Sequence, residues 1–149
     1  MSKTKIVEID GARYQIGKMG AAEGSHIHWR ILGALLREQQ QDGQREQTED
    51  ERRQADAVGD EEKAKMLVTL GLMRGLTFED TQFAQRAALR VVSRLEWAGN
   101  AEHPMPIVTA DGRFVPAELG DDAALVSLLT VESLAFNLAP FFSKSRSAS

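Results

Sequence analysis

The chain has 149 residues, of which 42% are hydrophobic, so it can build one hydrophobic core but is short for two domains. It contains no cysteine, which excludes disulfides and thiolate metal ligands and favours a reducing compartment. Its net charge of −4 comes from residues 39–65. Lysine and arginine are not concentrated anywhere in the sequence in the way that a nucleic-acid-binding surface requires.

A β-hairpin is predicted over residues 6–16. The dipeptide Asp10-Gly11 suits a two-residue type I′ turn, because both central residues of that turn need a positive φ. This turn sets Glu8 opposite Arg13, which predicts one apolar face and one face that carries an ion pair. Cross-strand pairs contribute only roughly 0.2–1 kcal/mol each, so the hairpin must pack on another element.

A helix is predicted over residues 21–38. Its apolar residues cover much of the circumference, and such a helix must contact more than one neighbour, either within the chain or from another subunit. One stripe consists of Ile27, Ile31, Ala34 and Leu35, with Trp29, Leu32 and Leu36 beside it.

The segment 39–65 is predicted to be a charged flexible insert. It holds nine acids and five bases, and Val58 is its only strongly hydrophobic residue apart from alanines. We therefore expect it to contribute nothing to a core, although its composition allows either a solvated helical extension or a disordered linker. Gly43 and Gly59 weaken a continuous helix and favour the flexible form.

Two further helices are predicted after this insert. A short apolar helix covers residues 66–74, and Thr77 with Asp80 approximates a capping box for a second helix that ends near Trp97. The second helix places four apolar residues on one face, namely Phe83, Ala87, Val91 and Leu95.

A second hairpin is predicted over residues 107–115, with its turn at Asp111-Gly112. Pro104 and Pro106 are expected to hold the preceding chain extended. The elements together predict one α+β domain over residues 1–149, mainly helical, with about four helices and two short antiparallel β-hairpins. A four-stranded sheet that joins the two hairpins is one way to arrange them.

The last helix is predicted to begin near Asp121 and Asp122, whose carboxylates suit the positive end of a helix dipole. Residues 123–142 contain a single charged residue, Glu132, so their length alone would permit a membrane span. A charge at the midpoint of a span costs roughly 2.5–3.5 kcal/mol, which favours a buried or partner-facing helix over a tail anchor. Residues 143–149 are predicted to be a disordered tail.

The sequence contains no catalytic constellation of residues. His26 and His28 are two residues apart, which separates them by about 200° on a helix, so they cannot face one metal ion there. His103 lies beside Glu102 in a predicted loop. There is no glycine-rich phosphate loop and no nucleophile elbow. We therefore expect no enzyme activity, no catalytic residues, no metal site and no cofactor.

The apolar residues of the first and last helices are the candidate partner-binding residues. They exceed what one small sheet needs, and ample apolar surface in a small protein often marks an interface. The alternative, that they simply form the core, fits the sequence equally well. The candidates are Trp29, Leu32, Leu36, Leu125, Leu128, Leu129, Phe136, Phe141 and Phe142.

Three stretches resemble the tail assembly chaperones of long-tailed bacteriophages. Residues 7–19 are similar to the hairpin that starts many of these proteins, residues 21–36 to the helix after it, and residues 128–142 to the closing helix. The insert over residues 39–65 departs from the family's pattern. The resemblance implies a non-catalytic protein of the host cell cytoplasm that binds the tape measure protein, keeps it soluble and helps to recruit tail tube subunits.

Two other features of the function stay open at this point. A structural tail or connector subunit of a phage virion is the alternative, because the same apolar faces and hairpins would suit it. Self-association into an oligomer is allowed, whereas neither a nucleic acid nor a membrane is expected as a partner.

Overall fold

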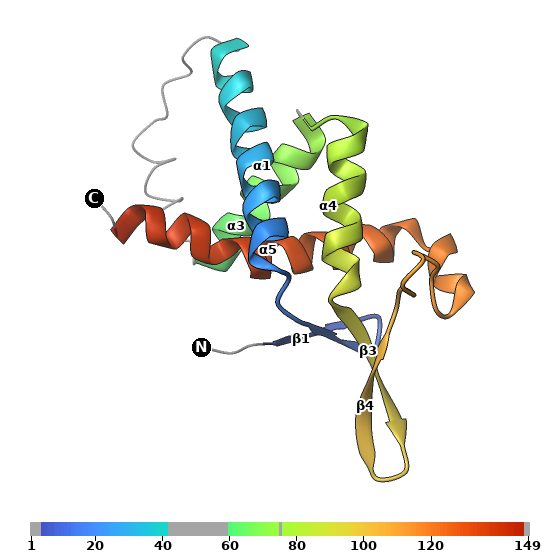
Figure 1. Ribbon diagram of the computed structural model, residues 1–149. Helices are drawn as coiled ribbons and strands as arrows, with labels where there is room; N and C mark the ends of the chain where they lie inside the picture. Colours follow the sequence, from blue (N-terminus) through green and yellow to red (C-terminus); the bar gives the residue numbers. More distant parts are fainter. Residues whose placement is uncertain (1–3, 42–59, 75, 148–149) are drawn as a thin grey trace.

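The computed structural model describes residues 4–41, 60–74 and 76–147, and Figure 1 shows how its helices and strands are arranged. The described residues form an α+β fold with four α-helices and a four-stranded antiparallel sheet made of two hairpins, which confirms the predicted class. The elements in chain order are β1 (Lys5–Ile9), β2 (Ala12–Ile16), α1 (Ala21–Gln41), α3 (Asp60–Arg74), α4 (Phe78–Arg90), β3 (Val92–Ala98), β4 (Ala101–Pro106), the short 3-10 helix η1 (Ala117–Asp121) and α5 (Ala123–Ser147).

The first hairpin forms in the predicted register. Asp10 and Gly11 have positive φ values of 52° and 81°, as a type I′ turn requires, and Glu8 lies opposite Arg13. The ion pair differs from the prediction, because Arg13 pairs with Glu102 of β4. The apolar face of β2 is buried against the helices, so the alternation of apolar and polar residues predicts the buried face correctly.

The helix predicted to end near Trp97 is shorter than expected. α4 ends at Arg90, and the chain continues directly into β3, which pairs with β2 on one side and β4 on the other. The turn between β3 and β4 is Gly99-Asn100, where Gly99 has a φ of 67°. The prediction is wrong because Leu95 continues the helical spacing of apolar residues although it lies in a strand.

The hairpin predicted over residues 107–115 is only a tight loop. A single bridge between Val108 and Phe114 joins its two arms. The second hairpin of the sheet is instead β3–β4, and Pro104 and Pro106 belong to its edge strand. An edge strand tolerates proline because a proline nitrogen that points away from the sheet removes no hydrogen bond of the ladder.

The ends of the predicted flexible insert are helical. α1 continues to Gln41 and α3 begins at Asp60, and Ala64 is completely buried, so the expectation that this segment contributes nothing to a core is wrong for residues 60–65. The rest of the insert, residues 42–59, lies outside the described residues. α5 continues to Ser147, so the backbone of the expected disordered tail is helical as far as that residue.

Two helices begin near the predicted positions, and a side chain caps each of them. The hydroxyl of Thr77 accepts a hydrogen bond from the backbone N–H of Asp80 at 3.1 Å. The carboxylate of Asp122 accepts one from the N–H of Leu125, also at 3.1 Å. Each side chain therefore satisfies a backbone N–H that has no partner within its own helix.

The core consists of two clusters that share α4 and α5. Figure 1 shows α5 running across the molecule behind α1 and α4. The cluster among the helices contains Ile27, Ile31, Val68, Ala84, Ala87, Ala88, Leu134 and Leu138. The cluster between the sheet and the helices contains Tyr14, Ile16, Leu89, Val92, Ile107, Leu119 and Leu129.

Candidate partner-binding surface

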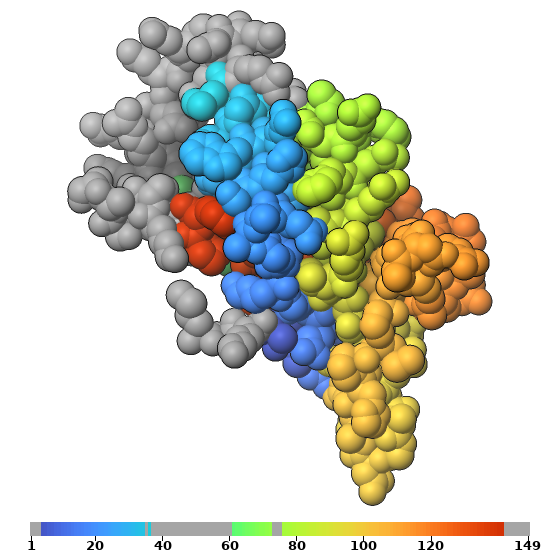
Figure 2. Space-filling model, viewed as in Figure 1, coloured from blue at the N-terminus to red at the C-terminus, as the bar shows by residue number. Residues whose placement is uncertain are grey.

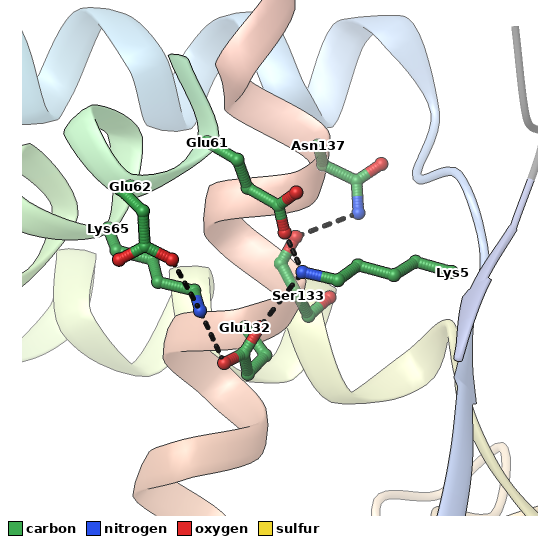
Figure 3. A network of polar contacts seen from close by, with 7 residues as sticks. All are labelled: Lys5, Glu61, Glu62, Lys65, Glu132, Ser133 and Asn137. Carbon is green, nitrogen blue, oxygen red and sulfur yellow. Dashed lines mark hydrogen bonds and ion pairs between the residues drawn. The ribbon is translucent and has the colours of Figure 1, made fainter. Parts of the chain in front are cut away.

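Glu132, the charge within the apolar run of α5, lies in a network of ion pairs (Figure 3). Its carboxylate is 2.7 Å from the ammonium of Lys65 in α3 and 3.4 Å from that of Lys5 in β1. Lys5 also pairs with Glu61, and Lys65 with Glu62. The hydrogen bond to Glu132 raises the pKa of Lys65 above its ordinary value. Glu132 therefore holds α3 and β1 against α5, which is a structural role.

Ser133 and Asn137 form a second set of polar contacts along α5, and both side chains are buried. The Ser133 hydroxyl donates to the carbonyl of Ala88 at 2.7 Å, which joins α5 to α4. The Asn137 amide accepts from the N–H of Met19 at 2.8 Å and donates to the carbonyl of Gly17 at 3.1 Å. Because the connection between β2 and α1 has no strand or helix partner for these backbone groups, Asn137 satisfies them.

An apolar stripe on α1 faces away from the core. Trp29 is 65% exposed and Leu36 is 52% exposed, while Leu32 between them is partly exposed. These residues are spaced by three and four positions, so they lie on one face of the helix. The opposite face carries the buried Ile27 and Ile31. This outward set, Trp29, Leu32 and Leu36, is called the α1 stripe below.

The candidate residues on α5 are mostly part of the core. Leu129 is completely buried, so it belongs to the core and not to an open surface. Leu125 and Phe136 are partly buried and pack against the sheet cluster, and Phe141 packs in the same way against the helical cluster. Leu128 alone among the α5 candidates with described side chains is largely exposed, at 52%. The side chain of Phe142 lies outside the described residues.

The buried face of α5 is determined by its neighbours and cannot be read from its sequence. Apolar residues surround this helix on all sides, so its hydrophobic pattern does not mark one face as interior. The neighbours decide which face is covered, and here α3, α4 and the sheet pack around it. Of the two apolar helices in the prediction, α1 therefore carries the larger open stripe and α5 provides the core.

The three histidines do not converge on a common site. His26 lies edge-on against Phe83 with ring centroids 4.9 Å apart, and His28 stacks on Phe141 at the same separation. Burial lowers the pKa of His28, because the charged form loses solvation. His103 lies on β4, in the other hairpin. In the described part of the chain, no three His, Cys, Asp or Glu residues form a group that could hold a metal ion.

The outer face of the sheet carries exposed residues that are not among the predicted partner-binding residues. Figure 1 shows the helices on one side of the sheet. On the other side, Ile6 is half exposed and Trp97 is 71% exposed. An open groove of about 500 Å³ lies between the β1–β2 turn and β3, and its lining includes Arg13, Trp97 and Glu102. The sequence does not mark Trp97 as a surface residue of a sheet, because the apolar spacing before it predicts the end of a helix there.

α5 has the length and composition of a membrane span. Within the described residues, the stretch Ala123–Phe141 is the one that meets both criteria, and 44% of it is buried inside the molecule. A core helix of a water-soluble protein passes the same test, so this feature by itself does not distinguish the two.

Comparisons of the chain with protein-family models, with curated proteins and with solved structures found no match.

Proposed function

We propose that this protein is a tail assembly chaperone of a long-tailed phage. In this role it binds the tape measure protein in the host cell cytoplasm, keeps it soluble and helps to recruit tail tube subunits, without catalysing a reaction. The observation that carries the proposal is the α1 stripe, which leaves a large aromatic and a large aliphatic side chain in water. Exposed apolar residues grouped on one helix face are typical of a docking surface.

The spacing of the α1 stripe suits a helical client. Trp29 and Leu36 are seven residues apart, which is the repeat at which one helix meets another along a shared seam. Gly33 lies between them, and a Cβ atom at this position would meet no atom within 4 Å. A tape measure protein is a long helical chain with apolar stripes, so its helices could lie along this seam.

A chaperone of this kind must also release its client. Two turns of α1 bury little area, so one copy binds weakly. Many copies bound along the same client would give a high avidity. This avidity would fall stepwise as tail tube subunits replace individual copies of the chaperone. Low affinity for each copy is therefore compatible with the function.

Co-expression with the tape measure protein tests the proposal. The wild-type chain should increase the soluble fraction of the client and co-purify with it. The double variant Trp29→Ser/Leu36→Ser should lower the amount of co-purified client at least about tenfold, because exposed aromatic anchors dominate binding energies. The matched control is Phe78→Ser, which removes an exposed aromatic side chain from α4. If co-expression of the wild-type chain left the soluble fraction of the client the same as in its absence, the proposal would be contradicted.

Mass spectrometry of purified virions separates the chaperone from a structural tail or connector subunit. A chaperone leaves before the particle matures, so its peptides should be absent from the virion. A structural subunit should be present in a fixed ratio to the tail tube protein, and that result would favour the alternative.

A further inference from the structure

The β3–β4 hairpin extends beyond the body of the molecule (Figure 2). Only Val92, Ser93 and Arg94 of β3 pair with β2, so the rest of the strand is held by β4 alone. The outer part of this hairpin, residues 95–104, is called the finger below. It carries the strongly exposed Trp97 and the exposed Glu96, which has no ion pair among the described residues.

The edge of the finger that β4 forms is closed to strand addition. Ala98 and Ala101 flank a two-residue turn and form a hydrogen-bonded pair, so alternate residues of β4 direct their backbone groups outward. Pro104 and Pro106 occupy two of these outward positions, and proline has no N–H to donate. Such prolines prevent edge-to-edge pairing. A partner that approaches the finger from the β4 side must therefore bind its side chains.

A groove on another part of the molecule has complementary chemistry. It lies between α4 and the loop over residues 107–114 and has a volume of about 410 Å³. Leu89, Val108 and Phe114 give it an apolar lining. Arg86 and Arg90 lie one helical turn apart on α4, and Arg90 pairs with Glu23 whereas the lining also includes Asp111, which pairs with Arg113. The structure gives Arg86 no ion pair among the described residues.

The finger does not line this groove within one molecule, since none of residues 92–106 contributes to its walls. We propose that the finger of one copy docks into the groove of a second copy. Glu96 and Trp97 are consecutive strand residues and point to opposite faces of the finger. The finger would therefore lie between the two walls of the groove, with the Trp97 indole against Phe114 of the loop and the Glu96 carboxylate against Arg86 of α4. The opposite charges and the match of an exposed indole to an apolar groove carry this assignment.

The contact joins two different surfaces, so it is heterologous. A copy whose finger is bound to one neighbour still has an empty groove that can bind the finger of another copy. Association therefore continues as an open chain and does not stop at a dimer. The proposal does not rest on the chaperone function, because it concerns the purified chain alone. If the chaperone function and the finger–groove contact are both correct, successive copies bound along one client also contact one another.

Sedimentation velocity of the purified chain over roughly a hundredfold range of concentration tests the proposal. The average sedimentation coefficient should rise with concentration without a plateau at the dimer. Trp97→Ala should lower the association constant at least about tenfold. The control Phe78→Ala, which removes an exposed aromatic ring from α4, should leave it unchanged. Trp29→Ala is measured beside it, because it reports a contact through the α1 stripe instead. Far-UV circular dichroism checks that each variant keeps the fold.

Charge reversal tests the pairing of the two surfaces. Glu96→Arg and Arg86→Glu should each weaken association, and the double variant should restore it to within about threefold of the wild type. Mixing Trp97→Ala, which retains the groove, with Arg86→Glu, which retains the finger, should yield dimers that grow no further.

Four results would overturn the proposal. The first is a wild-type chain that stays monomeric at every concentration, and the second is association that stops at a dimer. The third is loss of association in Trp29→Ala but not in Trp97→Ala, which would place the second copy on the α1 stripe. The fourth is a charge-reversed double variant that does not recover.

Discussion

The ammonium of Lys65 lies 2.7 Å from the carboxylate of Glu132 and joins α3 to the middle of α5. Both side chains are about three-quarters or more buried, at 25% and 20% exposure. The charge that interrupts the apolar run of α5 is therefore compensated by a residue at the end of the predicted flexible insert. This pairing explains how α5 carries a charge at its midpoint while it packs in a protein core.

Glu132→Gln tests the strength of this pairing. The variant keeps the shape of the side chain but leaves Lys5 and Lys65 without their shared counter-ion. We expect the free energy of unfolding to fall by about 1–2 kcal/mol, between the values for exposed and buried pairs. Urea denaturation measures the change. The control Glu118→Gln alters an exposed carboxylate that has no ion pair among the described residues, so it should change stability by less than about 0.5 kcal/mol. Equal effects of the two substitutions would show that the network does not stabilise the fold.

The raised pKa of Lys65 predicts a loss of stability in alkali. The hydrogen bond to Glu132 makes the folded chain hold this proton more tightly than the unfolded chain. The stabilisation is complete below the ordinary lysine value of about 10.4 and is lost as the pH rises from there through the higher folded pKa. Urea denaturation from about pH 8 to about pH 11.5 should show a steeper fall for the wild type than for Lys65→Met. Parallel curves would contradict the prediction.

Asn137→Asp tests the amide that connects α5 to the segment before α1. The carboxylate cannot donate to the carbonyls of Gly17 and Ser133, and it places a negative charge against them. We expect the free energy of unfolding to fall by about 2–4 kcal/mol at neutral pH. Part of this loss should be recovered near pH 4, because a protonated carboxyl can donate again. The same amide-to-acid change in the exposed Gln82 should have little effect at either pH.

Two glycines provide a matched test of helix packing. A Cβ atom on Gly71 of α3 would lie 2.8 Å from Cγ2 of Ile31 in α1, whereas one on Gly33 of α1 would meet nothing within 4 Å. Gly71→Ala should therefore lower stability by about 1–3 kcal/mol. Gly33→Ala should leave it unchanged or raise it by up to about 1 kcal/mol. Thermal denaturation compares the two variants.

A double variant then identifies the cause. In Gly71→Ala/Ile31→Ala the contacting methyl group is absent, so the combined loss should be smaller than the sum of the two single losses. Additive effects would show that the two residues are not in close contact.

The β elements show what local sequence predicts and what it leaves open. The first hairpin is determined by its own residues, since Asp10-Gly11 and the alternation around it require no information from elsewhere. β3 depends on distant partners, because β2 and β4 supply its hydrogen bonds and Leu95 fits a helical spacing just as well. Pro104 and Pro106 predict only an extended chain, and proline is compatible with the outer edge of a sheet, but the sequence does not say which strand is at the edge.

The partner-binding candidates fall into two groups, exposed residues on α1 and mostly buried residues on α5, and tertiary packing again decides part of the outcome. On α1, Trp29 and Leu36 lie on the face opposite Ile27 and Ile31, so helical spacing separates the two sets although the apolar surface of the helix is broad. On α5 almost every position is apolar, and only packing decides that Leu129 is covered while Leu128 is open. Surfaces made by the tertiary fold, such as the finger and the groove beside α4, require the sheet order before they can be recognised.

Because α5 contributes Leu134 and Leu138 to one cluster and Leu129 to the other, neither cluster is complete without it. A ribosome makes α5 after every other described element. The nascent chain therefore leaves both apolar clusters incomplete until α5 has emerged from the ribosomal exit tunnel. Neither cluster can therefore complete its native packing before α5 has been synthesised.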